Sequence, residues 1–147
     1  MNLVFVDGGT KFLREVAHKT VAFCIDELMP ESNHVNFHVQ LQTIKSEATG
    51  YAGMGDNRKE YILDIDKNQT LREFISTICH EMVHVKQYFY KEMDDTTNDD
   101  GNYRWHPKGG EETVIPKDTL YSDLPWEVEA YDLQYKLADE IWEKNIV

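Results

Sequence analysis

Cysteine is scarce in this sequence. Its only copies, Cys24 and Cys79, fall on the sides of two expected helices that face the protein core. We therefore expect buried thiols and no disulfide bond. Reduced cysteines of this kind fit the cytoplasm, where thiols are kept from pairing.

Basic residues are also few, with 15 Lys and Arg against 27 Asp and Glu, so the net charge is −12. A nucleic acid needs a basic surface that can neutralise its phosphates. An anionic membrane surface needs the same positive charge. The composition therefore predicts a protein with neither nucleic acid nor membrane as a partner.

Long hydrophobic runs are missing as well. No stretch approaches the roughly 20 apolar residues that a membrane-spanning helix needs. The first residues, Met1–Asp7, lack the basic start and the long apolar run of a signal peptide, and we expect a cytoplasmic protein. Because the 147 residues contain no repeat or low-complexity linker, we expect one domain over residues 1–147.

The spacing of apolar residues predicts an α+β fold. Helical spacing covers Thr10–Met29, about Leu71–Glu92 and about Pro125–Lys144. Alternating patterns predict strands at Val35–Gln42 and Glu60–Asp66. Weaker signals predict a short strand at Leu3–Val6, a glycine-bearing edge strand within Thr49–Gly55, an acidic solvated loop at Asp94–Asn102 and a hairpin within Asn102–Ile115.

The second expected helix contains the motif His80-Glu81-Met82-Val83-His84. Residues four apart lie on the same helix face, so His80 and His84 can bind one divalent ion. Glu81 is rotated by about 100° from His80 and can act on a water activated by that ion. Thr70 and Glu73 form a capping-box pattern that predicts the start of this helix. We interpret the motif as a catalytic site for one Zn²⁺ ion.

Catalytic zinc needs a third protein ligand and an open position. The acidic pair Glu127 and Glu129 begins the last expected helix, where the two side chains differ by about 200° and only one can face the metal. We prefer Glu127, because it falls inside the apolar arc of that helix, where an unpaired carboxylate would be costly. Glu129 and His106 remain alternatives.

With these motifs the chain resembles the zincin metallopeptidases, in particular the gluzincins, whose third ligand is a glutamate on a second helix. Its length suggests a minigluzincin-like domain, or a SprT-like or phage-type small metallopeptidase. The matching residues are His80-Glu81-Met82-Val83-His84 and Glu127-Val128-Glu129-Ala130. The resemblance implies a zincin-like minimal catalytic domain with a small, mostly antiparallel twisted sheet. It departs at Tyr131, where relatives often carry Asn or Asp, and a SprT-like origin would favour His106 as third ligand.

The function that follows is zinc-dependent hydrolysis of peptide bonds in a peptide or protein substrate. Glu81 would serve as the general base, and one further donor would stabilise the oxyanion. Candidates for this donor are Tyr103, His106, Tyr121 and Tyr131, of which Tyr131 is best placed on its helix. The substrate would extend along the edge strand at Tyr51–Met54.

Two other functions stay open. The first is a non-proteolytic structural or interaction protein that binds metal and retains a zincin fold. The second is a peptidase that is inactive until a partner or a processing step opens it. The sequence does not define the oligomeric state.

Overall fold

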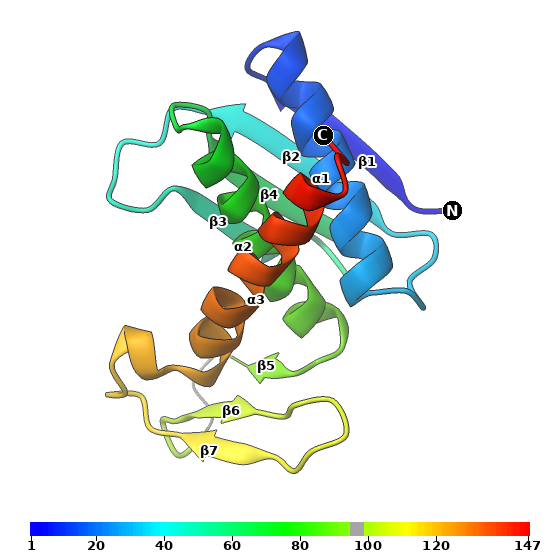
Figure 1. The fold of residues 1–147 in the computed structure, drawn as a ribbon. Coiled ribbons are helices and arrows are strands. Elements are labelled where there is room, and N and C mark those ends of the chain that lie inside the picture. The colour runs from blue at the N-terminus through cyan, green and yellow to red at the C-terminus, as the bar shows by residue number, and fades with distance from the viewer. Residues whose placement is uncertain (95–98) are drawn as a thin grey trace.

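The computed structural model describes residues 1–94 and 99–147 of the chain. Its main sheet has four strands, β1 (Leu3–Gly8), β2 (Asn36–Gln42), β3 (Gly50–Met54) and β4 (Glu60–Asp66). Their order in space is β1-β2-β4-β3, so β3 lies at one edge (Figure 1). The expected glycine-bearing edge strand is therefore confirmed.

The expectation of a mostly antiparallel sheet is wrong. The β1–β2 and β2–β4 pairs are parallel, and only the β3–β4 pair is antiparallel. The alternating apolar pattern of β2 and β4 reflects burial of one face of the sheet, and such burial is more common in antiparallel sheets. The alternation therefore indicated which side chains are buried, but not the direction of the strands.

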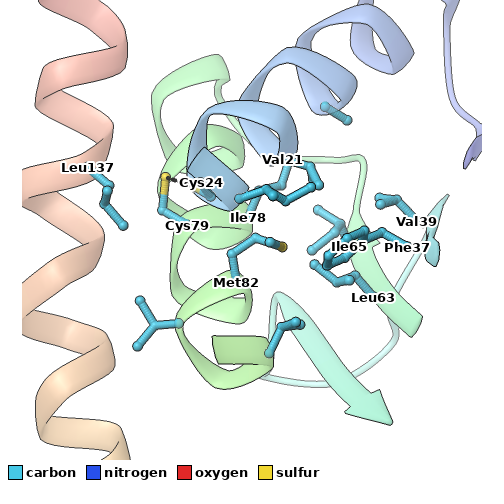
Figure 2. Packing of buried hydrophobic residues seen from close by; sticks show 14 of the residues in the cluster. Val21, Cys24, Phe37, Val39, Leu63, Ile65, Ile78, Cys79, Met82 and Leu137 are labelled. Atoms are coloured by element: carbon cyan, nitrogen blue, oxygen red, sulfur yellow. Dashed lines mark hydrogen bonds between the residues drawn. The ribbon is translucent and has the colours of Figure 1, made fainter. Parts of the chain in front are cut away.

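Two helices, α1 (Lys11–Leu28) and α2 (Leu71–Phe89), pack with the main sheet to form the core. Figure 2 shows Val21 of α1, Ile78 and Met82 of α2, and inward side chains of β2 and β4 gathered there. Cys24 and Cys79 join α1 to α2 as free, fully buried thiols with sulfur atoms 3.8 Å apart. The prediction of two buried thiols is confirmed.

The third helix, α3 (Pro125–Glu143), packs mainly against α2 and crosses it in Figure 1. Ala130 of α3 is fully buried, and its small side chain lets the two helices approach closely. This packing brings the first turn of α3 beside the second half of α2, and the candidate site lies there.

The ends of α2 are set by local chemistry. Thr70 and Glu73 form the predicted capping box at its start. The helix ends at Phe89, three residues before the expected Glu92, because Lys91 adopts a left-handed backbone conformation with φ of 57°.

A second, three-stranded antiparallel sheet follows α2 and lies near the start of α3 (Figure 1). It contains β5 (Met93–Asp94), β6 (Tyr103–Trp105) and β7 (Thr113–Ile115). The β6–β7 pair confirms the predicted hairpin, whereas β5 was not expected. Of the predicted acidic loop, residues 95–98 lie outside the described part of the chain.

A short 3-10 helix, η1 (Tyr121–Asp123), connects β7 to α3. Within residues 1–94 and 99–147, no helix combines the length and the apolar character required to cross a bilayer.

Candidate metal centre

The α2 helix presents two histidines on its side facing α3. His80 and His84 are one turn apart, and each side chain is about nine-tenths buried. Their Nε2 atoms lie 3.2 Å from each other. The predicted pairing of these imidazoles on one helix face is therefore present.

Glu127, in the first turn of α3, completes the group. Its side chain is 6% exposed, and its Oε1 and Oε2 atoms each lie 3.1 Å from one histidine nitrogen, of His80 and His84 respectively. Pro125 occupies the first turn of this helix, where its missing N–H costs nothing. Helix packing thus brings a carboxylate from α3 to the two imidazoles of α2.

The three side chains fit a metal ion in both chemistry and spacing. Imidazole nitrogen and carboxylate oxygen are ordinary ligands of Zn²⁺, at bond lengths of about 2.0–2.2 Å. Ligands at that distance in a tetrahedron stand about 3.3 Å apart. The separations of 3.1–3.2 Å among His80, His84 and Glu127 are close to this value.

Hydrogen bonds at the far side of each ring fix which imidazole nitrogen faces the centre. The Gln87 amide nitrogen donates to the Trp126 carbonyl oxygen at 2.9 Å and to Glu129 at 3.0 Å. The Gln87 oxygen therefore faces His84 Nδ1, 2.8 Å away, and this nitrogen must donate. His84 Nε2 is left as the atom that points at Glu127.

His80 is held in the same manner. Its Nδ1 atom lies 2.6 Å from the amide oxygen of Gln134 on α3. With both Nδ1 atoms donating, the two Nε2 lone pairs and the Glu127 carboxylate converge on one point. This arrangement is repulsive unless a cation, either a proton or a metal ion, lies among them.

The pKa values of Glu127 and His84 reflect the same attraction for positive charge. Burial alone would raise the pKa of Glu127, but hydrogen bonds from His80 and His84 lower it to about 2. Burial alone would lower the pKa of His84, but the hydrogen bond and negative charge of Glu127 outweigh it, so the pKa is raised. The group attracts positive charge strongly.

Glu81 lies beside this group and is 7% exposed. Its burial raises the pKa of the carboxyl group, although the two histidines oppose the effect. Glu81 lines a cavity of about 170 Å³ together with His80, Tyr121 and Tyr131. A raised pKa brings a carboxylate closer to the range in which it works as a general base.

Gly50 of β3 allows the edge strand to approach Glu81. A Cβ atom at this position would lie 2.8 Å from Thr77 Cγ2 and 3.1 Å from Glu81 Cγ, closer than packed carbons normally come. Gly53, on the same strand, has open space at the corresponding position. Of the two glycines within β3, packing therefore requires Gly50 but not Gly53.

Two tyrosines, Tyr131 and Tyr121, lie beside the His80-His84-Glu127 group and Glu81. The Tyr131 ring lies edge-on to His80 with centroids 4.6 Å apart. Tyr121 lines the cavities on both sides of Glu81, and burial together with the Glu127 charge raises its pKa well above the usual value. A hydrogen bond to Glu127 contributes to the raised pKa of Tyr121, and burial raises the pKa of Tyr131, so both hydroxyl groups keep their protons near neutral pH.

The alternative third ligands lie elsewhere. Glu129 accepts hydrogen bonds from Lys86 and Gln87, and so supports His84 indirectly. His106 lines a different cavity, of about 460 Å³, near Arg58 and Arg104.

Sequence reasoning did not anticipate Gln87 and Gln134 as supports of the histidines. The only local sign of such a support in the sequence was the position of Gln87, three residues after His84 on the same helix.

Comparison of the chain with protein-family models, with curated proteins and with solved structures found no match. The resemblance to zincins therefore depends on the two sequence motifs and on the geometry that unites them. What the structure establishes is an α+β chain with a buried His80-His84-Glu127 group that could hold one metal ion.

Proposed function

We propose that this protein is a zinc-dependent metallopeptidase of the zincin type. One observation carries the proposal. Gln87 and Gln134 hold the two imidazoles with their Nε2 lone pairs toward Glu127, and the carboxylate of Glu81 is buried beside them. A structural zinc site is normally closed by four protein ligands, whereas the described residues supply three here. This count supports a catalytic use of the ion.

His80, His84 and Glu127 would hold the ion. Zinc in such a site supplies Lewis acidity and lowers the pKa of water toward neutrality. Glu81 takes the proton of the water that attacks the peptide carbonyl carbon. It then gives this proton to the leaving amine nitrogen as the C–N bond breaks.

The oxyanion that forms on the carbonyl needs a hydrogen-bond donor. We assign this role to Tyr131, whose ring packs against His80. Tyr121 is the alternative, because it lines both cavities beside Glu81. Replacing each tyrosine by Phe in turn identifies the donor, because loss of an oxyanion donor reduces kcat by about 100- to 1,000-fold.

The substrate binds as an extended segment along the outer edge of β3. This edge has no strand partner among the described residues, because β3 ends the sheet. An added peptide strand would gain main-chain hydrogen bonds there, beside Tyr51–Met54. Gly50 keeps the strand close to Glu81, so a bound peptide would pass the catalytic group.

Glu81→Gln tests the proposal directly. The wild-type protein should bind one zinc ion and cleave a denatured protein mixture. Glu81→Gln should bind zinc equally well but lose activity by at least about 100-fold, because a positioned base contributes that much or more. The exposed Glu15→Gln change on α1 provides the control.

Two results would contradict the proposal. Full activity in Glu81→Gln would remove this residue from the role of base. One bound zinc ion without any cleavage by the wild-type protein would favour a non-proteolytic metal-binding protein.

A further inference from the structure

A largely buried lysine lies two residues after His84 on α2. The side chain of Lys86 is only 14% exposed, and lysine is rarely buried to this extent without a partner. Its Nζ atom lies 2.9 Å from Glu129 Oε1 on α3 and 2.8 Å from Glu92 Oε1, just beyond the end of α2. One cation thus holds two carboxylates from different parts of the chain.

Glu129 carries the effect of this cation toward the candidate metal centre. The Oε1 atom that contacts Lys86 also accepts a hydrogen bond from Gln87 Nε2 at 3.0 Å. Gln87 in turn accepts a hydrogen bond from His84 Nδ1 at 2.8 Å. A series of three contacts therefore runs from Lys86 through Glu129 and Gln87 to His84.

Glu129 needs this cation in order to stay beside Gln87. Its side chain is 28% exposed, so the carboxylate can turn toward water, where an unpaired charge is more stable. The Glu92 carboxylate on the other side of the ammonium group repels it as well. Without the cation, the Gln87 amide nitrogen would keep one hydrogen bond, to the Trp126 carbonyl oxygen, in place of two.

We propose that Lys86 is a positioning residue, which acts through Glu129 and Gln87 to keep His84 Nε2 facing Glu127. The proposal rests on the zinc site of the proposed function. The Lys86 charge has two opposite effects on zinc: repulsion between cations weakens binding, whereas a firmly held imidazole strengthens it. The sign of the change in affinity when the charge is removed therefore distinguishes positioning from simple repulsion.

The contact with Glu92 is a separate, structural branch. The Glu92 side chain is 2% exposed, and its Oε2 atom accepts a hydrogen bond from the backbone N–H of Lys108 at 2.9 Å. The Glu92 carbonyl oxygen accepts another from the backbone N–H of His106 at 2.7 Å. These bonds fasten the β6–β7 hairpin to the end of α2, so a change at Glu92 tests the structural branch by itself.

The test measures zinc affinity by chelator competition in variants of the full chain. Lys86→Met keeps most of the side-chain volume but removes the charge. It should weaken zinc binding by about tenfold, the lower end of the effect of groups that orient metal-binding histidines. Lys86→Arg keeps the charge and should restore most of the affinity. Lys19→Met removes an exposed charge from α1 and should bind zinc as the wild-type protein does.

Glu92→Gln separates the two branches. It removes the second carboxylate but keeps an oxygen for the Lys108 N–H, so it should reduce stability and leave zinc affinity unchanged. A zinc affinity that falls as much in Glu92→Gln as in Lys86→Met would make Lys86 a structural residue only.

Two further measurements follow the series of contacts. Lys86→Met should add little to the loss of zinc affinity that Glu129→Ala already causes, because both changes break the same connection. NMR of the zinc-loaded protein should show a His84 Nδ1 proton that exchanges slowly with water in the wild type and faster in Lys86→Met. Fully additive losses, or equal exchange rates, would contradict an effect that passes through Glu129 and Gln87.

If Lys86→Met does not fold, because it leaves the buried Glu92 carboxylate without a cation, Lys86→Met combined with Glu92→Gln replaces it. Its reference is then Glu92→Gln alone. Unchanged or tighter zinc binding after loss of the Lys86 charge would overturn the positioning role and leave the peptidase intact. Weaker binding that Lys86→Arg restores, in a protein that cleaves no peptide, would overturn the peptidase and keep the positioning role. A wild-type protein that binds no zinc would overturn both.

Discussion

Gln87 orients His84 by accepting a hydrogen bond from its Nδ1 atom at 2.8 Å. The same amide donates to Glu129 and to the Trp126 carbonyl oxygen on α3. One buried side chain thus fixes the tautomer of an imidazole and joins the two helices that supply the candidate metal ligands. Gln134 acts on His80 in the same way.

Replacing Gln87 by Met should weaken zinc binding by about 10- to 100-fold, because an outer partner that orients a metal-binding histidine is worth that much. The measurement is competition with a chromophoric chelator. Gln40→Met, at an exposed position of β2, should bind zinc as the wild-type protein does. Equal affinities of the Gln87 and Gln40 variants would contradict an orienting role.

Substitutions of Glu127 and Glu129, two residues apart on α3, distinguish the expected metal ligand from a residue that only supports His84. Glu127→Gln removes the carboxylate that faces both histidines, and should reduce zinc affinity far more than Glu129→Gln. The second change affects only the hydrogen bonds from Lys86 and Gln87. Zinc titrations of both variants check this order. A larger loss in Glu129→Gln would make Glu129 the third ligand.

Gly50→Ala should impair both stability and activity. The new methyl group would press on Thr77 and Glu81, and overpacking of this kind costs about 1–3 kcal/mol. Gly53→Ala, on the same strand, meets no atom within 4 Å and should change stability by less than about 0.5 kcal/mol. Urea unfolding and peptide hydrolysis of the two variants provide the comparison. Equal stability and activity of the two variants would show that β3 can move away from Thr77 and Glu81 to make room for the methyl group.

Zinc affinity should fall as the pH is lowered. Burial lowers the pKa of His84, but Glu127 outweighs burial and holds it above the usual value of about 6.5. Below the raised pKa, zinc must displace a proton from His84, so affinity should drop by up to about tenfold per pH unit. Glu127, with a pKa of about 2, stays charged and adds no slope near neutrality.

Chelator competition between about pH 6 and pH 8 measures this dependence around the histidine range. Calorimetry in two buffers of different ionisation enthalpy counts the protons released on binding. A constant affinity across the range, with no proton release, would show that His84 is already neutral in the metal-free protein.

The His80-His84-Glu127 group was largely predictable because its signals are local. The helical spacing of α2 places His80 and His84 one turn apart wherever that helix lies. The capping box at Thr70 and Glu73 sets the start of the helix through contacts within one turn. The position of Glu127 inside an apolar arc indicated that its carboxylate has a buried partner, and the structure brings it to the two histidines.

Other features depend on contacts between distant segments, and only the tertiary structure decided them. Alternation along β2 and β4 reports which face is buried, but not that the two strands pair in parallel, which depends on how the chain crosses between them. In the sequence, nothing distinguishes Gln87 and Gln134 from other helix glutamines. Their hydrogen bonds between α2 and α3 form only when the two helices pack together. Gly50 is required only because β3 lies against Thr77 and Glu81. Local spacing fixes what a single helix or strand presents, whereas the partners of each side chain depend on how the elements meet.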